Sequence, residues 1–495
     1  MQRVARLSSL VVLLAATVMV QFPTLPALAK GKPGPGGTYA RDGSGSATTP
    51  TVNVLANSTV NTIVLTYTAA SGGMSNGVVT IAVPSGWSSP SIGGSDPGFT
   101  TASTGTVAVS VQVITVSGVT LSGGSSVVVT YGSTGSGGPG ATAPGPVGVQ
   151  TWGVQQKSTP SGTLTSLASS PSILVAILLP PFHTEGNLIK DAKGNPVIMR
   201  GIERELTEKG TFPNDAEIGQ IRSWGANIVR IPLSESLWLN TCASSLPSND
   251  PTYPGAVDAE VRSVTSRGMV ALIELNFNVT RLCGTPGPQP MADAQFSGTF
   301  WQQVASRYKG NEWVAFDLYN EPHDITDQVW LNGGQVSTGA LTFDAEGMQQ
   351  MYTVVRNTGA TNLIFVSGED WADRPATTLV SGSNVVNAVH DYTCPEYPPP
   401  QCTTQNPYDP SPILNHWLAV GLIQPVMVTE FGWPDKQDGT YNANLIADSE
   451  TDGWGWIVFA FTGTSNGLFD LITDTATYYP APAGVPVKNG LVKNG

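Results

Sequence analysis

The stretch VAFDLYNEP, residues 314–322, decides how the larger part of this chain is organised. It begins as an apolar run typical of a buried strand and ends abruptly in Asn320, Glu321 and Pro322. Proline has no N–H to donate to a sheet, and it disfavours helical geometry in the residue before it. The strand therefore ends here, which leaves the carboxylate of Glu321 at its carboxyl end.

A second stretch, PVMVTEFGW at residues 425–433, repeats this pattern. It is another apolar run that ends in a glutamate, Glu430, followed by an aromatic residue and a glycine. A single glutamate at the end of a strand is often only a solvated loop charge or a helix-capping group. Two carboxylates at the tips of buried strands are the pair that acid/base and nucleophilic chemistry on a glycosidic bond requires.

Apolar strands alternate with helical patterns beyond Pro180-Pro181, which is typical of parallel βα units. We expect eight strands near residues 198–202, 227–231, 270–275, 314–318, 363–366, 385–390, 426–430 and 456–461. Helical patterns occupy residues 215–223, 256–267, 292–308, 343–358, 411–420 and 442–452, with room for only a short helix at 373–380. This alternation predicts an α/β fold, a (β/α)8 TIM barrel over residues 177–495, with its active site at the carboxyl ends of the strands.

The N-terminus has the features of a secretory signal peptide over residues 1–29. Arg3 and Arg6 precede an apolar core, and Ala27-Leu28-Ala29 forms a small-residue cleavage site. The apolar run is shorter than the ~20 residues that a membrane-spanning helix needs. Residues 30–50 are dominated by Gly, Pro, Ser and Thr, which predicts a flexible linker. We therefore expect a secreted, extracellular protein.

Short β-branched runs separated by Gly, Ser and Pro recur over residues 51–176 and predict an all-β sandwich accessory domain of the immunoglobulin-like type. Asp96 and Lys157 are its only charged residues, so it has almost nothing with which to run acid/base catalysis. It is either a carbohydrate-binding or attachment module with Trp87 and Trp152 as stacking platforms, or a structural spacer with both tryptophans in its core. We favour the spacer.

The charge balance and the cysteines narrow the classes of partner and cofactor. A net charge of −13, with only 12% charged residues, argues against nucleic acid or an anionic membrane as the main partner. Four cysteines in an exported chain favour two disulfides, and of the three possible pairings we prefer Cys242 with Cys283 and Cys394 with Cys402. No CxxC or HExxH motif occurs, so we expect no metal site.

Asn320-Glu321-Pro322 and Glu430-Phe431-Gly432, in this order and spacing, resemble the motifs of glycoside hydrolase family 5, the cellulase-like enzymes of the retaining (β/α)8 clan. The resemblance covers roughly residues 185–475. It implies that Glu321 is the acid/base, that Glu430 is the nucleophile, and that Asn320 hydrogen-bonds the 2-hydroxyl of the sugar. Hydrolysis with retention requires the two carboxyl groups to lie ~5 Å apart.

Further residues at strand ends match the same family. Arg230 ends the second strand, where look-alikes place an arginine that keeps the nucleophile ionised; otherwise it forms an interior salt bridge. His390-Asp391-Tyr392 matches the family's His-x-Tyr, which implies that His390 contacts the substrate and Tyr392 contacts the nucleophile. A lone histidine on an apolar strand is otherwise a satisfied core residue.

The chain departs from the family at three places. Asn276 ends the third strand where the family usually has histidine, which removes one imidazole contact to the sugar. Phe459 and Phe461 occupy the last strand where a stacking tryptophan is usual, although Trp456 could replace it in another register. Glu203 stands where relatives often have asparagine, and we expect it to pair with Arg204.

Three tryptophans, Trp238, Trp371 and Trp433, each follow a predicted strand and are candidates for stacking against sugar rings. Core packing is the alternative for each, most of all for Trp238.

These observations predict a secreted retaining glycoside hydrolase that acts by double displacement on a β-linked polysaccharide or oligosaccharide. The expected activity is that of an endo-β-1,4-glucanase. A mannanase or another family 5 β-glycosidase is the alternative within the class, and a non-catalytic cell-surface glycan-binding protein is the alternative outside it. We expect no cofactor, no nucleic-acid or membrane partner, and a monomer.

Overall fold

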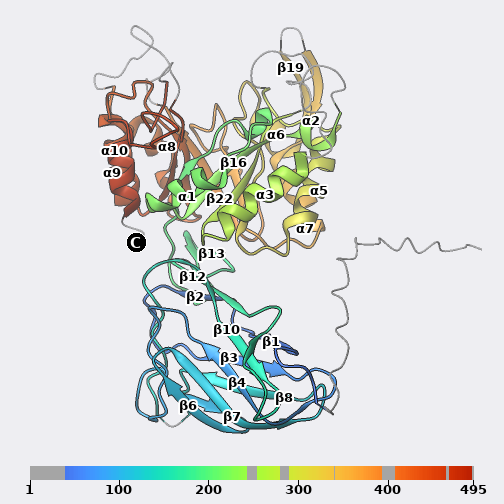
Figure 1. Ribbon diagram of the computed structural model, residues 1–495. Helices are drawn as coiled ribbons and strands as arrows, with labels where there is room; N and C mark the ends of the chain where they lie inside the picture. Colours follow the sequence, from blue (N-terminus) through green and yellow to red (C-terminus); the bar gives the residue numbers. More distant parts are fainter. Residues whose placement is uncertain are drawn as a thin grey trace, which may run out of the picture.

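The computed structural model describes residues 39–135, 137–241, 253–278, 289–338, 341–392, 407–463 and 468–492 (Figure 1). Its N-terminal part is built of strands alone, and its C-terminal part is a barrel surrounded by helices. No helix among these residues is both long and apolar enough to span a membrane.

The N-terminal part is a β-sandwich. A four-stranded sheet, in the order β1-β3-β8-β5, faces a five-stranded sheet, β11-β10-β4-β7-β6, and a third sheet has the order β2-β12-β9. Side chains of the two larger sheets alternate between core and surface and meet in one apolar core. The strands are β1 (Ser46–Thr48), β2 (Asn53–Leu55), β3 (Ile63–Thr68), β4 (Met74–Ala82), β5 (Thr100–Ala102), β6 (Thr106–Ser110), β7 (Val113–Leu121), β8 (Ser126–Tyr131), β9 (Gly148–Thr151), β10 (Gly153–Lys157), β11 (Thr165–Ser166) and β12 (Ser172–Ala176).

One expectation for this part is wrong and another is confirmed. The sheet begins at β1, inside the stretch expected to be a flexible linker, because β1 is an edge strand that pairs through its backbone and has no apolar pattern to reveal it. Trp87 and Trp152 are only 3% and 0% exposed. Their rings pack edge to face with each other and with Tyr131 in the core. They are core residues and not stacking platforms, as the spacer interpretation predicts.

The C-terminal part is a closed barrel of eight parallel strands, and all eight predicted strands are present. The barrel order β15-β16-β17-β18-β21-β22-β23-β24 follows the chain, as right-handed βα units require. The strands are β15 (Arg200–Glu203), β16 (Ile228–Ser234), β17 (Val270–Phe277), β18 (Val314–Asp317), β21 (Ile364–Ser367), β22 (Val385–Asp391), β23 (Val426–Phe431) and β24 (Gly455–Val458).

The helices agree with the sequence pattern apart from the segments that follow β17, β18 and β21. Residues 343–345 were expected to start a helix, but they belong to β20 (Leu341–Ala345), which pairs with β19 (Gly334–Thr338). Among the described residues, 373–380 contain no helix. The chain also contains β13 (His183–Glu185), β14 (Leu188–Lys190), η1 (Thr207–Lys209), α1 (Asp215–Ser223), α2 (Glu235–Leu239), α3 (Tyr253–Thr265), α5 (Ser297–Tyr308), α6 (Asp327–Asn332), α7 (Met348–Asn357), α8 (Ser411–Gly421), α9 (Thr440–Asp452) and α10 (Gly484–Leu491).

The connection between the two parts closes the end of the barrel at which the strands begin. Ala176, Leu178 and Phe182 join the apolar cluster that fills this end, together with Met199 and Trp313. In Figure 1 the sandwich lies below the barrel, beyond this cluster. The carboxyl ends of the strands, where Glu321 and Glu430 lie, face away from the sandwich.

Candidate active site

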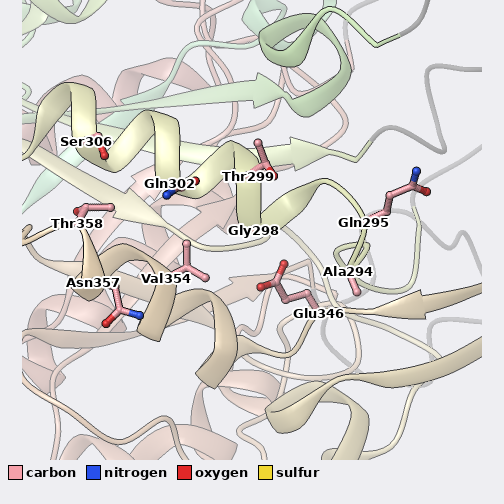
Figure 2. Close-up of a pocket in the computed structure, with 10 residues that line it drawn as sticks. All are labelled: Ala294, Gln295, Gly298, Thr299, Gln302, Ser306, Glu346, Val354, Asn357 and Thr358. Carbon is pink, nitrogen blue, oxygen red and sulfur yellow. The ribbon is translucent and has the colours of Figure 1, made fainter. Parts of the chain in front are cut away.

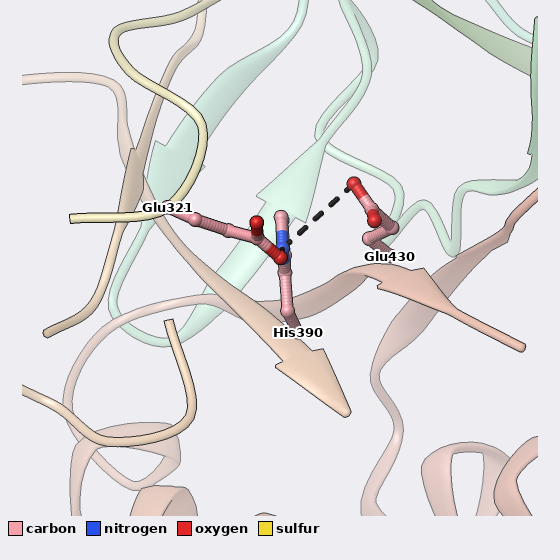
Figure 3. A group of neighbouring side chains, drawn as sticks. All are labelled: Glu321, His390 and Glu430. Carbon is pink, nitrogen blue, oxygen red and sulfur yellow. Dashed lines mark hydrogen bonds and ion pairs between the residues drawn. The ribbon is translucent and has the colours of Figure 1, made fainter. Parts of the chain in front are cut away.

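Glu321 and Glu430 meet at the carboxyl ends of their strands. Glu321 follows β18, and Glu430 is the penultimate residue of β23. His390, near the end of β22, lies between them (Figure 3). Nδ1 of His390 lies 2.9 Å from Oε1 of Glu321 and 3.8 Å from Oε2 of Glu430. A carboxylate oxygen of each glutamate lies within 4.8 Å of the other. The two acids are therefore close enough to act on one bond.

The contacts of His390 define its tautomer. Its Nε2 lies 3.4 Å from Nη2 of Arg230, which can only donate a hydrogen bond, so Nε2 accepts and the proton is on Nδ1. Nδ1 then donates to Glu321. Burial lowers the pKa of His390 to about 4, and the nearby Arg230 charge acts in the same direction. The imidazole is therefore neutral near neutral pH and is more than a satisfied core residue.

Burial also changes the protonation of Glu321. Its pKa is raised to about 7, although Arg230 and the amide of Asn320 act in the opposite direction. A carboxylic acid that keeps its proton up to this pH can donate it to a leaving oxygen. Glu321 therefore has the environment of a general acid.

Glu430 is held by two donors. Nη1 of Arg230 lies 2.6 Å from its Oε2, and the hydroxyl of Tyr392 donates to its Oε1 at 2.7 Å. A guanidinium and a phenol directed at the two oxygens favour the ionised carboxylate. The contacts expected of Arg230 and Tyr392 are thus present.

Arg230 is the centre of a buried group of acids. Its side chain is fully buried and bonds to Glu203 at 2.7 Å, to Glu274 at 3.2 Å and to Asp317 at 3.1 Å, in addition to Glu430. Burial raises the pKa of Glu203 and Glu274 well above the usual range, and it raises the pKa of Asp317 as well.

The sequence interpretation missed this acidic group. Glu203 was expected to pair with Arg204, but this is wrong, because Arg204 bonds to Glu217 on α1. Glu274 and Asp317 were not singled out, although each is a lone carboxylate inside an apolar strand. That signal indicates a buried partner of opposite charge and could have identified both residues.

The two candidate asparagines contact this group from the open end of the barrel. Asn320 accepts a hydrogen bond from Nη2 of Arg230 at 3.0 Å, and its amide donates to Oε2 of Glu321 at 3.3 Å. Asn276 is partly exposed and donates to Glu274 at 3.2 Å. Asn276 thus links the acids around Arg230 to the surface of the site.

The three candidate tryptophans have different environments. Trp371 is 40% exposed, and its ring stacks on His323 with ring centroids 3.7 Å apart. The backbone N–H of Trp371 donates to the carbonyl of Pro322, next to Glu321. Asp370, Trp371 and Ala372 all have left-handed φ values, a strained arrangement that tends to occur at functional sites.

Trp433 also remains a candidate, whereas Trp238 does not. Trp433 follows Glu430, is partly exposed and packs against Tyr408 and Tyr441. Trp238 is only 6% exposed, since α2 directs it against Phe300 of α5. It is a core residue and cannot stack on a sugar.

The last strand has no exposed tryptophan. Trp456 is fully buried, and its indole donates to Glu450. Phe461 is buried as well, so only the partly exposed Phe459 offers an apolar face.

All four cysteines, Cys242, Cys283, Cys394 and Cys402, lie outside the described residues, so their pairing stays a prediction.

Within the described ranges, Glu321, His390 and Glu430 are the group of three that could ligate a metal, with one atom from each within 4.8 Å of the others. Two carboxylates and an imidazole suit a divalent transition metal. The same atoms already bond to one another, to Arg230 and to Tyr392, which is an arrangement suited to acid/base chemistry.

A groove of about 580 Å³ lies elsewhere, on the outer flank of the barrel between α5 and α7 (Figure 2). Amide and hydroxyl side chains line it, with Glu346 near one end. Its lining contains no aromatic side chain and neither Glu321 nor Glu430. It therefore lacks both a stacking surface and the reactive pair.

Comparison with known proteins agrees with this geometry. Residues 190–465 match the family described as cellulase (glycosyl hydrolase family 5). Endoglucanase 1 of Saitozyma flava is 30% identical over 226 residues, which are 44% of this chain and 64% of that protein. Endoglucanase EG-II of Hypocrea jecorina is 28% identical over 260 residues, 47% of this chain and 56% of that protein.

The chain thus spans between half and two thirds of the length of these curated relatives. Among solved structures, the catalytic domain of a Thermobifida fusca endoglucanase aligns with a TM-score of 0.47 and 17% sequence identity. That alignment covers 63% of this chain and 97% of the other.

Proposed function

Because this chain belongs to glycosyl hydrolase family 5, the cellulase family, we propose that it hydrolyses a β-linked polysaccharide with retention of configuration, as a secreted endo-β-1,4-glucanase. The curated relatives reported above are both endoglucanases. Secretion rests on the signal-like residues 1–29.

The observation that carries the proposal is the placement of two unlike carboxyl groups across one imidazole. Their oxygens lie within 4.8 Å, which fits the ~5–5.5 Å spacing of retaining glycosidases and is shorter than the ~6.5–9.5 Å spacing of inverting ones. Glu321 holds a proton up to about pH 7. Glu430 receives a guanidinium and a phenol that favour its charge. One acid is thus suited to donate a proton and the other to attack.

The reaction then follows in two steps. Glu430 attacks the anomeric carbon while Glu321 gives its proton to the leaving oxygen, which forms a glycosyl-enzyme ester. Glu321, now ionised, takes a proton from water, and the water breaks the ester with a second inversion. Throughout, His390 donates to Glu321 through Nδ1 and holds it in place.

Substrate binding is assigned to the surface around this pair. Asn320 lies beside Glu321 with its amide, a position suited to a sugar hydroxyl. Trp371 and Trp433 follow β21 and β23 at the same end of the barrel as the two acids, and both are at least partly exposed, which is what stacking on a pyranose ring requires.

Activity screening of the purified protein tests the proposal. Soluble β-glucans, mannans and xylans are incubated with wild type and with Glu430→Ala, and new reducing ends are measured together with viscosity. Release from β-1,4-glucan with a rapid fall in viscosity, absent from the variant, is the expected result. Proton NMR of the first product should show the β-anomer.

New reducing ends from mannan alone would show that the activity is that of a mannanase and not of a glucanase. Equal release by wild type and Glu430→Ala would refute the enzyme and leave a glycan-binding protein. An α-anomer as first product would refute retention.

A further inference from the structure

Two carboxylates share one nitrogen of Arg230. Nη1 lies 2.6 Å from Oε2 of Glu430 and 2.7 Å from Oε2 of Glu203. The side chains of Arg230, Glu203 and Glu430 are 0%, 2% and 10% exposed, so solvent screens none of these charges effectively. Glu203 is on β15 directly beside Arg230 in the sheet register, which makes this arrangement part of the barrel framework.

The charges around Arg230 do not balance if every acid is ionised. Glu203, Glu274, Asp317 and Glu430 all bond to this one guanidinium. Oε2 of Glu274 and Oδ1 of Asp317 are buried with no hydrogen-bond partner among the described residues. Four anions held by one cation, away from water, are unstable, so part of the group must be protonated. Attack on a sugar requires that Glu430 remain the ionised member.

We propose that Glu203 is a positioning residue that is kept as the neutral acid: it accepts a hydrogen bond from Nη1 of Arg230 and holds the guanidinium against Glu430 without competing for its charge. The proposal rests on the proposed function for the role of Glu430. Glu274 and Asp317 do not have this role. Glu274 bonds to Nη2 of Arg230, and Asp317 bonds to Nε and Nη2, so neither contacts the Nη1 that holds Glu430.

The surroundings of Glu203 favour its neutral form. Burial is the main cause that raises its pKa, and the Glu430 charge adds to it, with a smaller contribution from Glu274. Arg230 opposes these effects, and Tyr392, directly after β22, also interacts electrostatically with Glu203. A neutral carboxylic acid still offers its carbonyl oxygen to Nη1, so the contact does not depend on charge.

Two substitutions separate the contact from the charge. Glu203→Ala removes the acceptor, frees one side of Arg230 and should lower kcat by about 10- to 100-fold with KM little changed. Glu203→Gln keeps a neutral acceptor of the same shape and should restore most of that loss. It should also leave the acidic limb of the pH–rate profile in place, because no charge next to Glu430 has been removed. Glu185→Gln, at an exposed glutamate of β13, is the matched control.

A second readout does not need activity. A neutral Glu203 has a higher pKa in the folded than in the unfolded chain, so the folded protein binds the extra proton and loses stability as pH rises above the unfolded value. The melting temperature of Glu203→Gln relative to wild type should therefore increase from pH 5 to pH 8. Glu185→Gln should not show this increase.

Several outcomes overturn the proposal. They are a Glu203→Ala enzyme with wild-type kcat, a Glu203→Gln enzyme whose acidic limb moves to lower pH, or a relative melting temperature of Glu203→Gln that falls as pH rises. Any of these would make Glu203 either irrelevant or an ionised competitor for Arg230. A wild-type protein without activity would instead refute the proposed function, and the melting series would still decide the state of Glu203.

Discussion

Nδ1 of His390 lies 2.9 Å from Oε1 of Glu321, and Nε2 of the same ring faces Arg230, so one neutral imidazole joins the proposed general acid to the arginine that holds the proposed nucleophile. The carboxyl group that it orients has a pKa raised to about 7 by burial. The pH dependence of activity follows from this relationship.

Glycosidase activity should decline as pH rises through about 7. The raised pKa means that Glu321 is protonated, and can act as an acid, below about 7, and that it loses this proton above it. The logarithm of kcat/KM against pH should show a basic limb there. Full activity persisting to about pH 9 would contradict the assignment of Glu321 as the acid.

Glu321→Ala should lower hydrolysis of the polymer by about 10²- to 10⁴-fold, because general acid catalysis of the leaving oxygen is lost. With a dinitrophenyl glycoside, whose leaving group needs little protonation, the rate of the first step should fall much less. Added azide should rescue the variant and give a β-glycosyl azide. Glu430→Ala is the control, since an azide product of α configuration is expected there.

An α-azide from Glu321→Ala would exchange the roles of the two glutamates. Equal losses on the polymer and on the activated glycoside would also contradict the assignment.

Tyr392→Phe removes the donor that lies 2.7 Å from Oε1 of Glu430. A hydrogen bond to a charged group contributes about 1.5–3 kcal/mol, so kcat should fall about 10- to 100-fold. Tyr352→Phe is the control: its hydroxyl also bonds, but to Ser383 beside α7, so its kcat should not change. Equal kcat values for both variants would mean that Tyr392 does not act on the nucleophile.

Trp371→Ala should weaken substrate binding, whereas Trp238→Ala should lower the stability of the fold. Trp371 is 40% exposed beside the reactive pair, so its loss should weaken oligosaccharide binding, measured by calorimetry on Glu321→Gln, with little change in melting temperature. Trp238 is 6% exposed and hydrogen-bonds to Gln303, so its loss should destabilise the fold by about 3–5 kcal/mol. A Trp371 variant with unchanged affinity would remove it from the binding surface.

Glu260→Gln should stabilise the protein at pH 8 more than at pH 5. Glu260 on α3 is buried, Oε1 has no partner among the described residues, and burial raises its pKa from 4.5 to about 8. A raised carboxyl pKa means that the folded state binds the extra proton, so stability falls by about 1.4 kcal/mol per pH unit between these values. Urea unfolding at the two pH values measures the difference, and a gain that is equal at both would contradict it.

The barrel could be predicted from sequence because its signals are local. Each strand is an apolar run with its own end, and Pro322 or Gly432 marks where the two reactive strands stop. The hairpin of β19 and β20 was missed because its residues have a mixed pattern that also fits a helix, and its pairing partner decides between the two.

The sequence by itself determined the eight strands, the two glutamates at their carboxyl ends and the candidate partners Arg230, His390 and Tyr392, since these follow from periodicity and position along the chain. Only the tertiary structure decided that Glu203 bonds to Arg230 instead of Arg204, that Trp238 is buried while Trp371 is exposed, and that Glu321 keeps its proton to about pH 7. Each of these depends on burial and on charges supplied by strands that are far apart in the chain and become neighbours only when the barrel closes.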